Sequence, residues 1–199
     1  YEALKANTTG AQNVALGRNT LKAATVAGNN TAVGSQCFEQ VTTGETNTGL
    51  GYAAGYSLTT GNNNTLLGFN AGRATSPSGN LTTESNRVVI GDNNVTNSYI
   101  KVDWTVTSDE RDKTDIQDIT TGLDFVNQLK PKSFWFRKDR DSDVKHGDKR
   151  LGFIAQDILA LEGLDPVIID NNDLNNLKYK GEHLVPILVN AIKELSVKV

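Results

Sequence analysis

The sequence predicts a mixed architecture, with an N-terminal β-solenoid or β-roll made of repeats and a small α+β region that ends in a coiled-coil-like helix. Three observations predict it. A motif recurs every 17 residues in the first half, charged residues are concentrated in the second half, and apolar residues near the C-terminus alternate at spacings of 3 and 4. The first two observations divide the chain into two differently built modules, and the third places a helix at the end of the second module.

The repeat joins an asparagine to a glycine four residues later through small or aliphatic residues. It covers 13–17, 30–34, 47–51 and 64–68, and a degenerate copy covers 86–91. Periodic glycine permits tight bends with positive φ, and asparagines in one column can stack amide on amide between rungs about 4.8 Å apart. A second column, four residues after each glycine, holds Leu4, Leu21, Phe38, Gly55 and Gly72. The repeat therefore predicts a β-solenoid whose coils contribute one or two short strands and share stability with neighbouring coils or chains.

Two other interpretations of this half are weaker. A disordered linker rich in Gly, Asn and Thr would have a similar composition, but disorder does not require a fixed register of 17 residues. Gly49, Gly51 and Ala54 match the spacing of a dinucleotide-binding fingerprint, but no strand–helix–strand unit surrounds them. We therefore interpret the repeat as structural.

The composition excludes several classes of protein. Residues 1–100 hold only 10 of the 43 charged residues, and a net charge of −3 without clustered Lys and Arg excludes a nucleic-acid-binding module. The single Cys37 excludes an intrachain disulfide framework, and no set of Cys and His has zinc spacing. No apolar run approaches the ~20 residues of a membrane span. We therefore expect no cofactor, no metal ion, no nucleic-acid partner and no membrane insertion. A chain that lacks Met and begins at Tyr1 is expected to be part of a longer protein.

The charged half predicts short helices and strands. Strands are expected over 99–104, 133–137, 151–155 and 167–169, and a charged hairpin loop over 138–149. A short helix is expected over 121–129 with Thr121 as its N-cap, and another begins over 156–161. Alternate aspartates over 139–143 begin like a calcium-binding loop. Val144 and Arg150 occupy the places of its glycine and closing glutamate, so we expect a solvated turn instead.

The last 17 residues predict an amphipathic helix, in which Pro186 is tolerable only within the first turn. A helix this short is marginal by itself and needs partners. Its apolar residues form an a/d seam of two heptads: Val185, Leu188, Ile192, Leu195 and Val199. The seam predicts contacts with other chains, and packing of the helix on its own domain is the alternative.

Three ordered motifs in this half resemble a known family. The first is Ser-Asp-Glu-Arg-Asp-Lys at 108–113, followed by Ile116, 122–125 and 129–131; the second covers 152–157; the third covers 179–195. Together they resemble the C-terminal intramolecular chaperone auto-processing domain of phage tailspikes and fibres, the endosialidase type. The repeated half is similar to segments of viral fibres and, more loosely, to the heads of trimeric autotransporter adhesins.

The resemblance implies a self-cleaving serine peptidase that turns over once in cis and uses a Ser-Lys dyad. Carried over to this chain, the scissile bond joins Thr107 to Ser108, Ser108 is the nucleophile and Lys113 is its partner. Asp109 and Arg111 are expected to support the reaction by orienting these groups.

The resemblance also implies a homotrimer in which the C-terminal domain brings three chains together, helps the upstream fibre segment of the same polypeptide to fold, and then releases itself. The domains are then 1–107, the repeat stem at the end of the mature fibre, and 108–199, the chaperone domain. The fibre is expected in the virion as a tail fibre or spike, after assembly in the host cytoplasm. Two alternative functions are a trimerisation domain that does not cleave and an adhesin stem that binds a host receptor or glycan.

The dyad chemistry makes its own demands on the residues. A serine hydroxyl needs a neighbouring base, and a lysine acts as one only where burial lowers its pKa towards ~7–8. The family usually has an aliphatic residue where Asp112 stands, and a carboxylate there favours the charged form of Lys113. Without the resemblance, Ser108 would be interpreted as a helix N-cap and Lys113 as an exposed cation.

Overall fold

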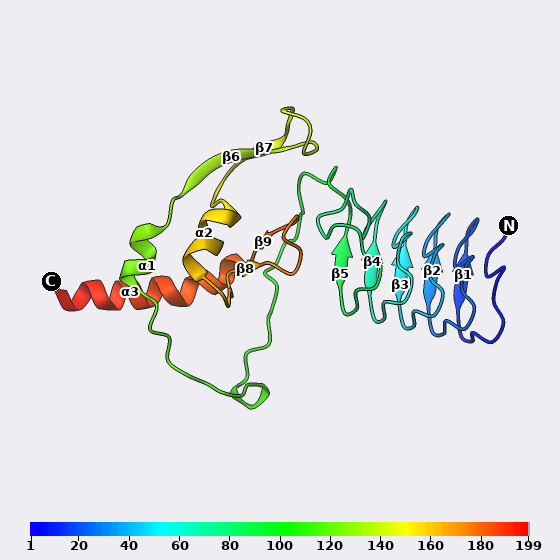
Figure 1. The fold of residues 1–199 in the computed structure, drawn as a ribbon, viewed down its shortest axis with the longest axis horizontal. Coiled ribbons are helices and arrows are strands. Elements are labelled where there is room, and N and C mark those ends of the chain that lie inside the picture. Colours follow the sequence, from blue (N-terminus) through cyan, green and yellow to red (C-terminus); the bar gives the residue numbers. More distant parts are fainter. Residues whose placement is uncertain (199) are drawn as a thin grey trace. The chain divides into compact units, whose positions relative to one another are not determined.

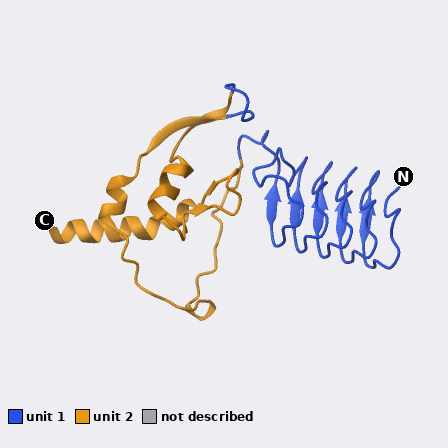
Figure 2. Cartoon of the chain, viewed as in Figure 1, with its two compact units in different colours: residues 1–97, 137–144 blue, residues 98–136, 145–199 orange. Residues whose placement is uncertain are grey.

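The computed structural model describes residues 1–198 and divides into two compact units. The first unit holds residues 1–97 and 137–144, and the second holds residues 98–136 and the chain from residue 145 onward (Figure 2). Each unit is described separately below.

The first unit is a parallel β-solenoid in which each coil contributes one short strand. The strands are β1 (Val14–Leu16), β2 (Thr31–Val33), β3 (Thr48–Leu50), β4 (Thr65–Leu67) and β5 (Val88–Ile90). They pair in chain order into one sheet (Figure 1). Hydrogen-bonded positions lie 17 residues apart between the regular coils and 23 apart across the last step. The predicted β-solenoid is confirmed, and its last step contains an insertion.

A buried asparagine ladder fixes the register between successive coils. Asn30, Asn47 and Asn64 are at most 1% exposed. The side-chain nitrogen of Asn47 donates to Asn30 Oδ1 (3.1 Å) and to the Gly61 carbonyl (2.9 Å). Its Oδ1 accepts from both the side chain and the backbone amide of Asn64 (3.0 Å each). The ladder begins at Asn13, and each buried amide satisfies its donors and acceptors along the stack.

The fifth coil continues the sheet but not the ladder. β5 pairs in parallel with β4, so the predicted fifth rung is confirmed as a strand. Its asparagine is displaced, because the backbone amide of Arg87, and not Asn86, donates to Asn64 Oδ1 (3.0 Å). Asn86 accepts instead from the side chain of Asn63 (2.8 Å), outside the buried column. The one extra residue in the degenerate motif therefore ends the ladder while the strand keeps its place.

The bends of the coil combine glycine with left-handed residues of other types. Gly17, Gly34 and Gly51 have φ between 132° and 137°, so the glycine column provides the predicted positive φ. A further left-handed column lies just before the ladder and consists of Gln12, Asn29, Thr46, Asn63 and Asn86. Short polar residues such as asparagine tolerate this region better than most, which makes the bend less visible in the sequence than one built on glycine.

The interior of the stem is packed around Phe38. This residue is fully buried and left-handed, with φ of 51°. A Cβ atom at Gly49 would lie 2.6 Å from Phe38 Cε2, and one at Gly55 would also overlap the ring. The adjacent coil therefore gives up side chains where the ring needs space, which keeps a core of unequal rungs well packed. The other buried members are Leu21, Ala24, Ala27, Ala32, Cys37, Val41, Ala54, Leu58, Leu66, Ala71, Leu81 and Val89.

The chain after the stem forms short helices and two-stranded sheets. The helices are η1 (Glu110–Asp112), α1 (Leu123–Gln128), α2 (Ala155–Glu162), η2 (Gly181–His183) and α3 (Leu184–Lys198). The strands pair as β6 (Lys132–Arg137) with β7 (Lys145–Gly152) and as β8 (Ile169–Asp170) antiparallel to β9 (Lys178–Tyr179). The predicted small α+β region with a terminal helix is confirmed (Figure 1).

Several predicted boundaries in this part are wrong. Residues 99–104 are exposed and irregular, because no strand of the described chain pairs with them. The strand predicted over 151–155 ends at Gly152, and α2 begins at Ala155. The strand predicted over 167–169 begins only at its last residue.

The start of α1 is held by α3 and not by the predicted cap. Gly122, and not Thr121, is the N-cap residue, and it has no side chain with which to cap the helix. The carboxylate of Glu194 accepts from the amide of Leu123 (3.0 Å), and the side chain of Asn190 donates to the Thr121 carbonyl (3.0 Å). A partner 71 residues away thus provides the cap, which local spacing does not reveal.

The three motifs of the charged half meet in one core. The buried residues are Ile158, Ile168, Ile169, Leu184 and Ile187, and partly buried residues packed against them include Phe125, Leu129 and Phe153. The stretch 122–131 provides Phe125 and Leu129, the second motif provides Phe153, and the third provides residues of α3. The motifs therefore share a structural role, and the Ser-Asp-Glu-Arg-Asp-Lys run lies outside this core.

Removing one rung of the ladder should destabilise the stem. In Asn47→Ala, the buried Asn64 side chain loses its acceptor and Asn30 Oδ1 loses a donor, so we expect the free energy of unfolding to fall by about 2–4 kcal/mol. Urea unfolding followed by circular dichroism measures this change. The control is Asn80→Ala, at an exposed asparagine of the insertion before β5. Equal stability of the two variants would contradict the role of the ladder.

The Cys37 thiol should be inert in the folded stem. It is fully buried, and burial raises the pKa of this thiol to about 12, so the reactive thiolate is scarce at neutral pH. We expect no reaction with an aromatic disulfide reagent at pH 8 without denaturant and complete reaction in urea. Rapid labelling of the native protein would show that this part of the core is open.

Candidate functional site

A tight turn brings the predicted nucleophile and its partner together. The η1 turn follows Ser108, and the backbone amide of Lys113 donates to the Glu110 carbonyl (3.0 Å), which closes the turn. The Lys113 ammonium thereby returns to Ser108, where it donates to the hydroxyl oxygen (2.8 Å) and to the carbonyl oxygen (3.0 Å). A serine and a lysine only five residues apart are thus in hydrogen-bonding contact.

The two predicted supporting residues stabilise the turn and not the reacting groups. Asp109 is the N-cap of η1, and its carboxylate accepts from the Arg111 amide (2.9 Å). The Arg111 guanidinium binds the same carboxylate through Nε (3.0 Å) and Nη2 (2.6 Å) and holds the pKa of Asp109 below its usual range. Asp109 therefore takes the N-cap position that was the alternative role for Ser108, and the Ser108 hydroxyl faces Lys113 instead.

Asp112 lies beside the predicted scissile bond. Its carboxylate accepts from the Thr107 hydroxyl (3.3 Å), the residue that provides the acyl part of that bond. Among residues 1–198 no ion pair joins Asp112 to Lys113. In this geometry the departure from the usual aliphatic residue restrains Thr107 more directly than it affects the lysine.

Solvent exposure distinguishes this arrangement from a buried dyad. Thr107, Ser108 and Lys113 are all exposed. Water competes for each of these hydrogen bonds, and an exposed ammonium keeps its hydration. The geometry of a Ser-Lys pair is therefore present in the single chain, while the desolvation on which a lysine base depends is not.

The terminal helix presents two apolar stripes. Leu184, Ile187 and Ala191 are buried, and the first two pack in the core of the chain's second half. The predicted seam lies on another side of α3 and is exposed: Val185 (55%), Leu188 (37%), Ile192 (67%) and Leu195 (50%). Val199, the last predicted seam residue, lies outside the described residues. Packing of the helix on its own domain therefore uses one stripe and leaves the seam residues uncovered.

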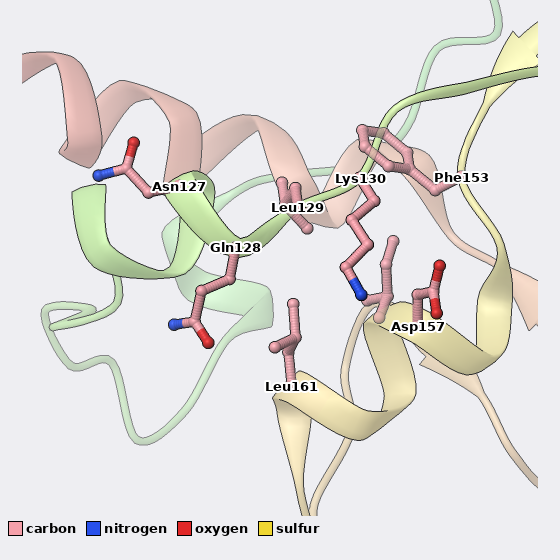
Figure 3. A pocket seen from close by; sticks show the side chains of 8 residues that line it. Asn127, Gln128, Leu129, Lys130, Phe153, Asp157 and Leu161 are labelled. Carbon is pink, nitrogen blue, oxygen red and sulfur yellow. The ribbon is translucent and has the colours of Figure 1, made fainter.

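A pocket of about 350 Å³ lies between the end of α1 and α2 (Figure 3). It is lined by Asn127, Gln128, Leu129, Lys130, Phe153, Asp157, Ile158 and Leu161. Figure 3 shows the Lys130 side chain extending towards α2. Ser108 and Lys113 are not among the lining residues, so the pocket is separate from the predicted site.

Two searches of the described chain concern metal ions and membranes. Residues 1–198 contain no group of three or more His, Cys, Asp or Glu side chains placed to hold a metal ion. In the loop that begins like a calcium site, Asp143 forms an ion pair with Arg137 (3.0 Å). No helix within this range has the length and apolar character needed to cross a membrane.

Comparison with known proteins gives one match. Residues 108–164 match the family described as the chaperone of endosialidase. No curated protein and no solved structure matches the chain. The matched segment begins at Ser108 and includes the turn to Lys113, α1, the β6–β7 pair and α2.

Proposed function

From the chaperone-of-endosialidase domain that begins at Ser108, we propose that this chain is the end of a viral tail fibre or spike whose C-terminal domain assembles three copies, folds the stem and then cuts itself off. The family match directly after a β-solenoid carries this proposal. It supports a fibre chaperone and trimerisation role, and it implies a domain of the self-cleaving serine peptidase type. The trimer, the Ser-Lys dyad and the release step are the finer parts of the proposal.

A repeat stem needs such a chaperone because its rungs are nearly interchangeable. The 17-residue motif permits pairing with the wrong rung, either within a chain or between chains. A C-terminal domain that joins three chains first would hold the stems in a common register while their coils form. The exposed seam of Val185, Leu188, Ile192 and Leu195 is the surface we assign to this contact.

The release step would proceed by attack of the Ser108 hydroxyl on the preceding carbonyl. The Oγ atom forms a bond to the Thr107 carbonyl carbon, the carbon–nitrogen bond breaks, and the Ser108 nitrogen takes up a proton to become a free amine. The resulting ester between Thr107 and Oγ is then hydrolysed by water, which leaves a carboxylate on Thr107 and restores the hydroxyl. Lys113 is positioned to accept and return the hydroxyl proton.

Assembly would provide the burial that the single chain lacks. Lys113 is exposed here, and a neighbouring chain that covered it would remove its hydration and favour its neutral form. Cleavage would then follow trimerisation and make folding of the stem effectively irreversible, a kinetic form of stability. A domain that assembles without cleaving is the second candidate, and the exposure of Lys113 is the observation that favours it. Binding of the stem to a host receptor or glycan remains a prediction.

Self-cleavage is tested by the mass of the purified protein. We expect the wild type to give two pieces, residues 1–107 and 108–199, while Ser108→Ala and Lys113→Arg remain intact, because the first lacks the nucleophile and the second cannot lose its proton. Intact mass spectrometry distinguishes the outcomes. Lys101→Arg, at an exposed lysine, is the matched control and should cleave like the wild type. A wild type that stays whole would support the non-cleaving alternative.

The seam is tested by its effect on oligomeric state. In a Ser108→Ala background that keeps the chain whole, Leu188→Ser together with Ile192→Ser should convert a trimer to a monomer. Neither side chain is buried in the chain's own core, so helix content should be unchanged. Sedimentation equilibrium measures the mass. Val197→Ser, which removes an exposed apolar residue outside the seam, should leave the trimer intact.

A further inference from the structure

The outward face of the solenoid sheet is aliphatic and exposed. In each strand the middle residue points into the core, as Ala32 and Leu66 do, and the first and third residues point outward. We call the ten outward residues the sheet face: Val14, Leu16, Thr31, Val33, Thr48, Leu50, Thr65, Leu67, Val88 and Ile90. Its third-residue column is aliphatic in every coil, and Leu16 (66%), Leu50 (54%) and Ile90 (61%) are largely exposed.

This exposure is unusual for a parallel sheet. Parallel strands normally occur where both faces of the sheet are covered, and the described chain covers only one face of β1–β5. The strands pair with unbroken register, so outward side chains of successive coils lie next to each other and form one patch. No charged residue belongs to the sheet face. A contiguous apolar patch of this kind marks an interaction surface.

We propose that the sheet face packs against the sheet faces of two further copies of this chain, aligned in parallel and in the same register. The proposal rests on the proposed trimerisation and adds the surface that the stem contributes to it. A register-matched copy is the partner that fits the patch best, because it repeats an aliphatic residue at the same rung spacing. The absence of charge on the face also means that identical copies meet without repulsion between like charges.

The size of the sheet face explains why the stem cannot assemble alone. Ten side chains of this kind, each about half exposed, offer on the order of 500 Å² of surface. A stable interface needs about 800 Å² from each partner. The face is therefore too small to hold chains together without the C-terminal domain, yet large enough to exclude water once that domain has brought three stems side by side.

Cysteine cross-linking of the full chain tests the contact. In the Ser108→Ala background, Leu50→Cys should place identical cysteines from neighbouring copies close together, and mild oxidation should convert most monomer into disulfide-linked dimer on a non-reducing gel. The control is Thr60→Cys, at an exposed residue of the same stem that lies outside the sheet face, which should remain monomeric on the gel. Native Cys37 is buried and should not contribute.

Register is tested by mixing two cysteine variants. Leu16→Cys and Leu50→Cys lie two rungs apart, about 10 Å at the spacing of strands in a sheet. A disulfide needs Cα atoms within about 7 Å, so co-expressed variants should form links only between equal positions. Links between residues 16 and 50 would overturn the common register.

The outcomes separate this proposal from the one on which it rests. If Leu50→Cys is trimeric by sedimentation but cross-links no more than Thr60→Cys, the sheet face is not the contact and trimerisation stands. If the Ser108→Ala protein is monomeric by sedimentation, trimerisation itself fails and the sheet face has no second copy to cover it. A trimer in which Leu50→Cys remains accessible to a maleimide probe would likewise overturn the contact and leave the face free for a different partner, such as a glycan.

Discussion

The column of buried asparagines is the interaction on which the rest of the stem depends. Each amide bonds to the amides of the coils on either side, so a coil has a defined partner only when its asparagine is aligned with theirs. An amide left alone in this interior would lose its hydrogen bonds, and that cost makes a slipped register unfavourable. The same alignment places the glycine bends above one another and lets the Phe38 ring occupy the space left by Gly49 and Gly55. Register, bend and core are thus consequences of one repeated side chain.

The ladder acts within a chain and leaves the outside of the sheet unspecified. Aligning the coils also aligns their outward aliphatic residues, which produces an apolar face that the same chain does not cover. A low-charge repeat is suited to this arrangement, because a charge in one coil would lie beside its own copy in a register-matched neighbour. The two halves therefore meet complementary needs: the stem has a surface but too little area to assemble by itself, and the charged half has a helix whose seam is free.

The sequence predicted the features that repeat, or that depend on near neighbours, and missed those that depend on distant contacts. The period of 17 predicted the solenoid, because every coil reports the same geometry. The contact between Ser108 and Lys113 was expected from the family motif, and it forms through a turn of five residues. The cap on α1 was missed because Glu194 lies 71 residues away. A polar pair at Asn190 and Glu194, four residues apart on an otherwise apolar helix, was the available signal.

The exposure of Lys113 links the two halves of the molecule energetically. A serine hydroxyl that is cut free before the stem has folded would separate the chaperone from its client, so a dyad active in the single chain would defeat its purpose. A lysine held in place by a local turn but still hydrated avoids this outcome: its position is fixed early, and its basicity depends on what later covers it. Position encoded by the turn and activation supplied by assembly are separable, and that separation orders the steps as assembly, folding and release.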